Sequence, residues 1–73
     1  MYIINERIKY LRNEKKITQK KLAEIIGIKE VSFQRYEYGI SRPSLKMLIA
    51  LADYFDVSLD YLVGRSDNPG RLE

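Results

Sequence analysis

The 73-residue chain contains no cysteine and no histidine. Without cysteine it can form neither disulfide bonds nor thiolate metal sites, and without histidine it lacks the commonest general base. The sequence also offers no glycine-rich loop that could cradle a phosphate and no obvious pair of catalytic carboxylates. We therefore expect neither an enzyme nor a protein that needs a metal or another cofactor.

Long hydrophobic runs are missing as well. No segment approaches the roughly 20 apolar residues that a membrane-spanning helix needs, and the first residues, MYIINER, do not form a secretory signal. These absences predict a cytoplasmic protein with no membrane partner. An apolar content of 45% nevertheless argues against disorder, and the length allows one small domain.

A small excess of positive charge points to an anionic partner. The net charge is +3 and the isoelectric point is near 9.3, which suits a polyanion. Four lysines bracket the expected start of a second helix: Lys15, Lys16, Lys20 and Lys21. The alternative is that these lysines only keep a small domain soluble.

The segment 19–38, QKKLAEIIGIKEVSFQRYEY, predicts two short amphipathic helices separated by Gly27. Five apolar residues recur at helical spacing and are expected to face a core: Leu22, Ile26, Ile28, Phe33 and Tyr36. Small Ala23 stands where the two helix axes would approach closely, and Gly27 can adopt the left-handed conformation that ends the first helix. This arrangement is typical of a helix-turn-helix.

If Phe33 and Tyr36 face the core, the opposite side of their helix carries Glu30, Val31, Gln34 and Arg35. These side chains suit DNA bases, because Arg can pair with guanine, Gln with adenine and Glu with cytosine, while valine can pack on a thymine methyl group. Glu30 could equally stabilise the first helical turn through the helix dipole. For the whole stripe, the alternative is an ordinary solvated helix face.

The remaining segments predict three further helices, so the expected fold is all-α, a compact five-helix bundle. A first helix from about Asn5, a candidate cap, to Glu14 follows from Ile4, Ile8 and Leu11. Thr18 is the candidate N-cap of the second helix. A fourth helix, with Pro43 at its first position, follows from an apolar stripe that is expected to close the core: Leu45, Leu48, Ala52 and Phe55. Ser58 can cap a short last helix that holds Leu59, Leu62 and Val63.

One set of residues in the central region forms a family pattern: Gln19, Leu22, Ala23, Ile26, Gly27, Ile28, Ser32, Phe33, Tyr36, Glu37 and Gly39. With it the chain resembles the Xre-like helix-turn-helix regulators, the family of phage lambda-type repressors and Cro proteins. The resemblance covers Arg7 to Gly64, so residues 1–64 are expected to form one lambda-repressor-like DNA-binding domain, with its helix-turn-helix at 19–38. It implies a sequence-specific transcriptional regulator, a repressor, that places the helix around 29–37 in the major groove of double-stranded DNA.

The resemblance also implies roles for individual residues. Base readout falls to Lys29, Glu30, Val31, Gln34 and Arg35. Phosphate contacts fall to Gln19, Lys20, Tyr38, Ser41, Arg42 and Ser44. Gln19 is also expected to brace the recognition helix, and Arg12 to form a structural ion pair with Glu37, the alternative being two unrelated surface charges. Lys29 departs from the family, because Ser or Thr often caps the helix there, and a carboxylate at Glu30 is repelled by phosphates unless it meets a cytosine.

Relatives use the C-terminal end of this domain as a two-fold interface. The resemblance therefore implies that Tyr61, Leu62 and Val63 contact a second copy, at least on DNA, at a pseudo-palindromic operator. Alternatively these residues complete the core of a single domain. The alternative function is an adaptor or antitoxin-type module that binds a protein, which exposure of Phe33 or Tyr36 would favour. Residues 65–73 predict a flexible tail or linker, in which Leu72 and Glu73 could be left over from cloning.

Overall fold

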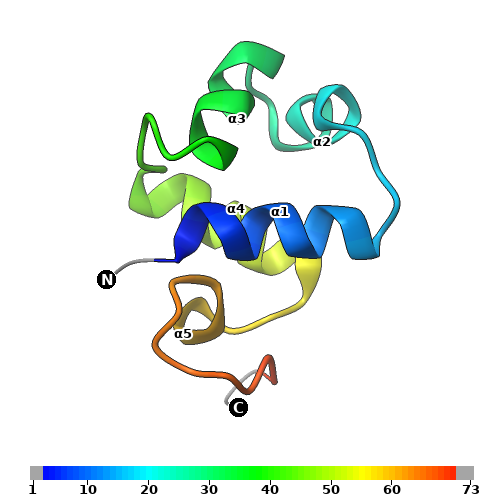
Figure 1. Ribbon diagram of the computed structural model, residues 1–73. Coiled ribbons are helices and arrows are strands. Elements are labelled where there is room, and N and C mark those ends of the chain that lie inside the picture. The colour runs from blue at the N-terminus through cyan, green and yellow to red at the C-terminus, as the bar shows by residue number, and fades with distance from the viewer. Residues whose placement is uncertain (1–2, 71–73) are drawn as a thin grey trace.

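The computed structural model describes residues 3–70, in which every regular element is an α-helix (Figure 1). The helices are α1 (Ile4–Glu14), α2 (Gln19–Ile26), α3 (Glu30–Glu37), α4 (Leu45–Phe55) and α5 (Leu59–Leu62). In Figure 1, α1 crosses the middle of the molecule, with α2 and α3 on one side and α5 on the other. The expected five-helix, all-α fold is confirmed. Within residues 3–70, no helix is long and apolar enough to cross a bilayer.

The first helix begins slightly earlier than the sequence predicts. The carbonyl of Ile3 accepts a hydrogen bond from the N–H of Arg7 at 2.8 Å, so Asn5 lies within the first turn and is not the cap. No side chain caps this end of α1. The helix is held instead by packing, because Ile8 is fully buried.

The helix-turn-helix has the predicted ends. The hydroxyl of Thr18 accepts a hydrogen bond from the N–H of Lys21 at 3.0 Å and so caps α2. Gly27 ends α2 with a φ of +80°, and its N–H donates to the carbonyl of Ala23. Lys29 precedes α3 without capping it, because an ammonium group has no acceptor to offer.

Ser44 marks the start of α4, which corrects the position expected for Pro43. The Ser44 hydroxyl accepts a hydrogen bond from the N–H of Met47 at 3.2 Å, so the helix begins at Leu45 and Pro43 lies before the cap. The serine side chain satisfies one of the N–H groups that a first turn leaves without a helical partner. At the other end Asp56 takes a left-handed conformation, and the Ser58 hydroxyl caps α5 as predicted.

All five helices contribute to one core. Its largest fully buried side chains, one from each helix, are Ile8, Leu22, Phe33, Leu51 and Leu62. Burying an apolar side chain of this size stabilises a fold by about 1.5–3 kcal/mol. The short helices therefore depend on their shared core more than on their own propensity.

The burial of two apolar residues bears on the sequence predictions. Leu45 was expected in the core and is 67% exposed. The buried side of α4 is defined by Leu51, Ala52 and Phe55, and at 100° per residue Leu45 points roughly 70° away from their mean direction. For Leu62 two roles were open, a contact with a second copy or completion of the core, and its full burial within the domain corresponds to the second.

Residues 65–70 form no helix but return to the domain. The N–H of Ser58 donates to the carbonyl of Pro69 at 3.1 Å. The Arg7 guanidinium lies 3.9 Å from the centre of the Tyr61 ring and donates to the carbonyls of Tyr61 and Ser66. Composition alone did not predict these contacts. Flexibility of the tail stays a prediction, and Leu72 and Glu73 lie outside the described residues.

Candidate nucleic-acid interface

The outward side of α3 is an exposed polar surface. Lys29, Glu30, Val31 and Arg35 are exposed, with 55% of Val31 accessible, and Gln34 is half-buried. The spacing of these residues puts them at the start and along one face of the helix. On the opposite face Phe33 is fully buried, and Tyr36 packs against the core. The aromatic exposure that would favour a protein-binding module is therefore absent from Phe33 and only partial at Tyr36.

Behind this surface, an ion pair joins α3 to α1. The Arg12 guanidinium donates to the Glu37 carboxylate from Nε at 2.5 Å and from Nη2 at 3.2 Å. Its Nη1 donates to the carbonyl of Ile17 at 2.8 Å, so the same side chain also holds the connection between α1 and α2. The side chain of Glu37 has no exposure and that of Arg12 only 14%. The pair is therefore part of the core and not two unrelated surface charges.

Gln19 extends this network from α2 to the exposed polar face of α3. Its amide donates to Glu37 Oε1 at 3.0 Å and accepts from the Gln34 amide at 3.3 Å. The Gln34 amide also donates to Glu30 Oε2 at 3.4 Å. Gln19 thus braces the C-terminal half of α3 at two positions, Gln34 and Glu37, and Gln34 is oriented before any ligand binds. The link between Gln34 and Glu30 was not predicted, although their separation of four residues on a helix permits it.

The predicted phosphate-contacting residues lie in two places. Gln19 and Lys20 begin α2, whereas four residues lie in the connection between α3 and α4: Tyr38, Ser41, Arg42 and Ser44. The N–H groups of Ile40 and Ser41 both donate to the carbonyl of Arg35, at 2.9 and 3.2 Å, which fixes this connection against the end of α3. Ile40, 63% exposed, is a neighbour of the site that the sequence did not single out.

The residues predicted to contact a second copy are divided by the fold. Leu62 belongs to the core, and Tyr61 and Val63 are half-buried. The Tyr61 ring is already covered in part by the Arg7 guanidinium. This end of α5 therefore mainly completes the single domain.

A comparison with protein-family models matches residues 8–62 to the helix-turn-helix family. The chain belongs to the Xre and lambda-repressor type of helix-turn-helix transcriptional regulators. This family consists of regulators and not of enzymes, which agrees with the expectation from the sequence. The matched range contains the helix-turn-helix itself, the Arg12–Glu37 ion pair and the connection to α4.

Relatives in this helix-turn-helix family come from several bacteria. The chain is 42% identical over 64 residues to the uncharacterized HTH-type transcriptional regulator YobD of Bacillus subtilis, covering 88% of this chain and 57% of YobD. It is 37% identical over 62 residues to the cryptic phage CTXphi transcriptional repressor RstR of Vibrio cholerae, covering 85% and 55% of the two chains. The chain thus spans a little over half the length of these relatives.

Solved structures of helix-turn-helix regulators share the fold. The P22 c2 repressor, in complex with a synthetic operator, superimposes with a TM-score of 0.80 and 30% identity over 86% of this chain and 96% of that one. A transcriptional regulator from Listeria innocua superimposes with a TM-score of 0.84 and 30% identity, over 88% and 60%. The five-helix arrangement is therefore that of repressor DNA-binding domains.

Proposed function

We propose that this domain binds double-stranded DNA with sequence preference and regulates transcription as a repressor, with α3 in the major groove. One observation carries the proposal. The polar outward face of α3 is exposed, while its inward face is fixed by the buried Glu37 carboxylate and the bracing amide of Gln19. A rigid helix with an open polar face suits base readout, because side chains held in place lose little conformational entropy on binding.

Base readout is the proposed role of Lys29, Glu30, Val31, Gln34 and Arg35. Arg35 can donate two parallel hydrogen bonds to guanine, and exposed Val31 can pack on a thymine methyl group. Glu30 accepts a hydrogen bond from Gln34, so it also orients that amide. This contact gives the carboxylate a use even where no cytosine faces it.

Phosphate contacts are the proposed role of Gln19, Lys20, Tyr38, Ser41, Arg42 and Ser44. These residues flank α3 on both sides in the chain, at the start of α2 and in the connection to α4. Contacts to phosphates on both sides of a groove would set the orientation of α3 without reading sequence.

Two copies on a pseudo-palindromic operator form the proposed complex. Binding by two equivalent domains doubles the length of sequence that such short helices can read, and the two-fold symmetry of the pair explains a palindromic site. The similarity to the P22 c2 repressor, a structure that contains a synthetic operator, supports the DNA partner. A cytoplasmic location follows from the proposed partner, since bacterial DNA lies there.

Selection of bound duplexes from a random pool, repeated at two salt concentrations, tests this proposal. We expect enrichment of a palindromic sequence whose preference over random DNA persists at the higher salt, because base contacts depend less on counterion release than phosphate contacts do. A reporter gene placed behind the enriched site should be silenced by the protein. Binding that is equal for all duplexes and disappears with salt would refute sequence-specific recognition.

A further inference from the structure

A buried carboxylate sets the direction of the hydrogen bonds behind α3. The oxygens of Glu37, which pairs with Arg12, can only accept, so Gln19 turns its NH₂ group toward them and donates at 3.0 Å. The carbonyl oxygen of Gln19 is thereby left for Gln34, from whose NH₂ group it accepts a hydrogen bond at 3.3 Å. The orientation of the Gln34 amide thus follows from a charge in the core.

The NH₂ group of Gln34 has no hydrogen left to donate. One of its two hydrogens goes to Gln19 Oε1 and the other to Glu30 Oε2, at 3.4 Å. By contrast, its Oε1 accepts no hydrogen bond from any group in residues 3–70. Every buried side-chain oxygen or nitrogen in this part of the chain has a partner, so Gln34 Oε1 is accessible to solvent. Toward a ligand, Gln34 therefore presents only an acceptor.

Such a glutamine recognises a base differently from one whose amide is free. A free amide pairs with adenine through two hydrogen bonds, since it donates to N7 and accepts from the N6 amino group. Gln34 can form only the second bond. In the major groove, adenine and cytosine carry an exocyclic amino group, whereas guanine and thymine present only acceptors. Glu30, whose carboxylate also only accepts, favours the same choice.

We propose that Gln34 recognises DNA as an acceptor alone, so that one position of each half-site is adenine or cytosine, and that methylation of the amino group there weakens binding. The inference rests on the proposed function, for which it names the chemical group that one side chain recognises. In a base pair, one amino hydrogen bonds to the partner base, and a methyl group takes the place of the other in the groove. Gln19 and Glu30 are positioning residues, because they occupy both hydrogens of the Gln34 amide.

Base analogues test the inference with the unchanged protein. Duplex selection with Gln34→Ala first identifies the base pair at which preference is lost, and adenine is placed there. The analogue 7-deazaadenine lacks N7 but keeps the amino group, so it should bind as adenine does. Purine, which lacks the amino group, and N6-methyladenine should each bind about tenfold more weakly. With Gln34→Ala, all four duplexes should bind alike, which controls for effects of the analogues on the duplex itself.

Three results would overturn the inference. The first is an equal loss with 7-deazaadenine and with purine, because it would show that Gln34 donates to N7. The second is a preference for guanine or thymine at this position, and the third is a selection that Gln34→Ala leaves unchanged. If the protein prefers one sequence but gives any of these results, the inference alone fails. Equal binding of all duplexes would instead refute the proposed function.

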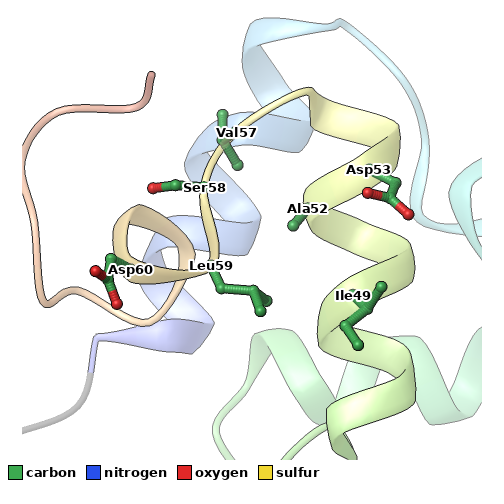
Figure 2. Close-up of a pocket in the computed structure, with 7 residues that line it drawn as sticks. All are labelled: Ile49, Ala52, Asp53, Val57, Ser58, Leu59 and Asp60. Atoms are coloured by element: carbon green, nitrogen blue, oxygen red, sulfur yellow. The ribbon is translucent and has the colours of Figure 1, made fainter. Parts of the chain in front are cut away.

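Replacing Glu30 with alanine gives a second measurement. The change frees one hydrogen of the Gln34 amide for N7, so 7-deazaadenine should now bind about fivefold more weakly than adenine. Asp60→Ala is the matched control. Asp60 is also an exposed acidic residue in the first turn of its helix, but it belongs to α5 and lines the hollow between α4 and α5 (Figure 2). The control should bind both duplexes equally, and a Glu30→Ala protein that did the same would contradict the inference.

Discussion

Glu37 is the residue through which α3 is tied to the rest of the domain. Its carboxylate has no solvent exposure and accepts hydrogen bonds from Arg12 and Gln19, which stand on α1 and α2. A buried charge is stable only when it is paired and its oxygens are hydrogen-bonded. The network therefore fixes one orientation of α3 relative to both preceding helices.

Replacing Arg12 with methionine should destabilise the domain strongly. The change leaves the Glu37 carboxylate buried without its cation, and breaking a buried pair from one side costs about 3–5 kcal/mol. Arg65→Met is the matched control, because Arg65 pairs with Asp60 at 3.8 Å on the surface, where such pairs contribute about 1 kcal/mol or less. Urea denaturation measures the free energy of unfolding of the two variants. Equal losses in the two variants would contradict a core role for Arg12.

Gly64 is a second position at which a single side-chain atom matters. Its φ is +87°, and a Cβ built there would collide with Cγ1 of Ile3. Gly27 has a similar φ of +80° but no atom within 4 Å of an added Cβ. Gly27→Ala should therefore cost only backbone strain, about 1–2 kcal/mol, and Gly64→Ala clearly more.

Thermal unfolding of the Gly64→Ala/Ile3→Ala double variant separates the two contributions. Removing most of the Ile3 side chain should relieve the collision, so the double variant should lose less stability than the sum of the two single changes. Strict additivity would mean that Ile3 moves aside without cost and that only the backbone conformation matters at Gly64.

At the scale of elements, α3 and the connection that follows it have different proposed roles. Helix α3 reads bases, and the connection to α4 contacts phosphates. Arg35 lies on the outward stripe of α3, whereas Arg42 stands just before the capped start of α4. Both are exposed cations, so their charge alone does not distinguish them. Their places in the fold do, because only the first lies on the helix proposed to enter the groove.

Alanine at these two positions should give different binding defects. Arg35→Ala should weaken discrimination at one base pair of each half-site by about 1–3 kcal/mol, with little change on unrelated DNA. Arg42→Ala should weaken binding to all duplexes alike and flatten its salt dependence, since a protein that neutralises one phosphate fewer releases about one counterion fewer. Titrations of the preferred and of a random duplex at several salt concentrations measure both effects. If Arg35→Ala weakened the two duplexes equally, Arg35 would be a phosphate-binding residue.

Much of each element could be predicted from the sequence because the signals are local. Thr18, Gly27 and Ser58 act through hydrogen bonds and backbone angles within a few residues, and all three end or begin helices as expected. The features that the sequence did not determine depend on the direction of a side chain or on contacts between residues far apart in the chain. Leu45 fits the apolar spacing but points away from the core, and the burial of Leu62 depends on helices far away in the sequence. The Gln34–Glu30 contact depends on rotamers, which spacing permits but does not determine.

For the whole molecule, the dimensions limit how the two proposed copies could meet on DNA. The domain measures 31 × 23 × 21 Å, and equivalent major-groove sites on one face of the duplex are about 34 Å apart. Two domains bound one turn apart are therefore just close enough to touch.

Changing the distance between half-sites tests this arrangement. Inserting five base pairs into the centre of the selected operator rotates one half-site by about half a turn and moves it about 17 Å further away, so the second copy lies on the opposite side of the duplex. Inserting ten restores the face but adds about 34 Å, which exceeds the size of the domain. Affinity for both altered duplexes should fall to that of independent half-sites, as measured by fluorescence anisotropy. Undiminished affinity after the five-base-pair insertion would mean that the copies bind without touching, because contact between two compact domains cannot survive a half-turn rotation of one of them.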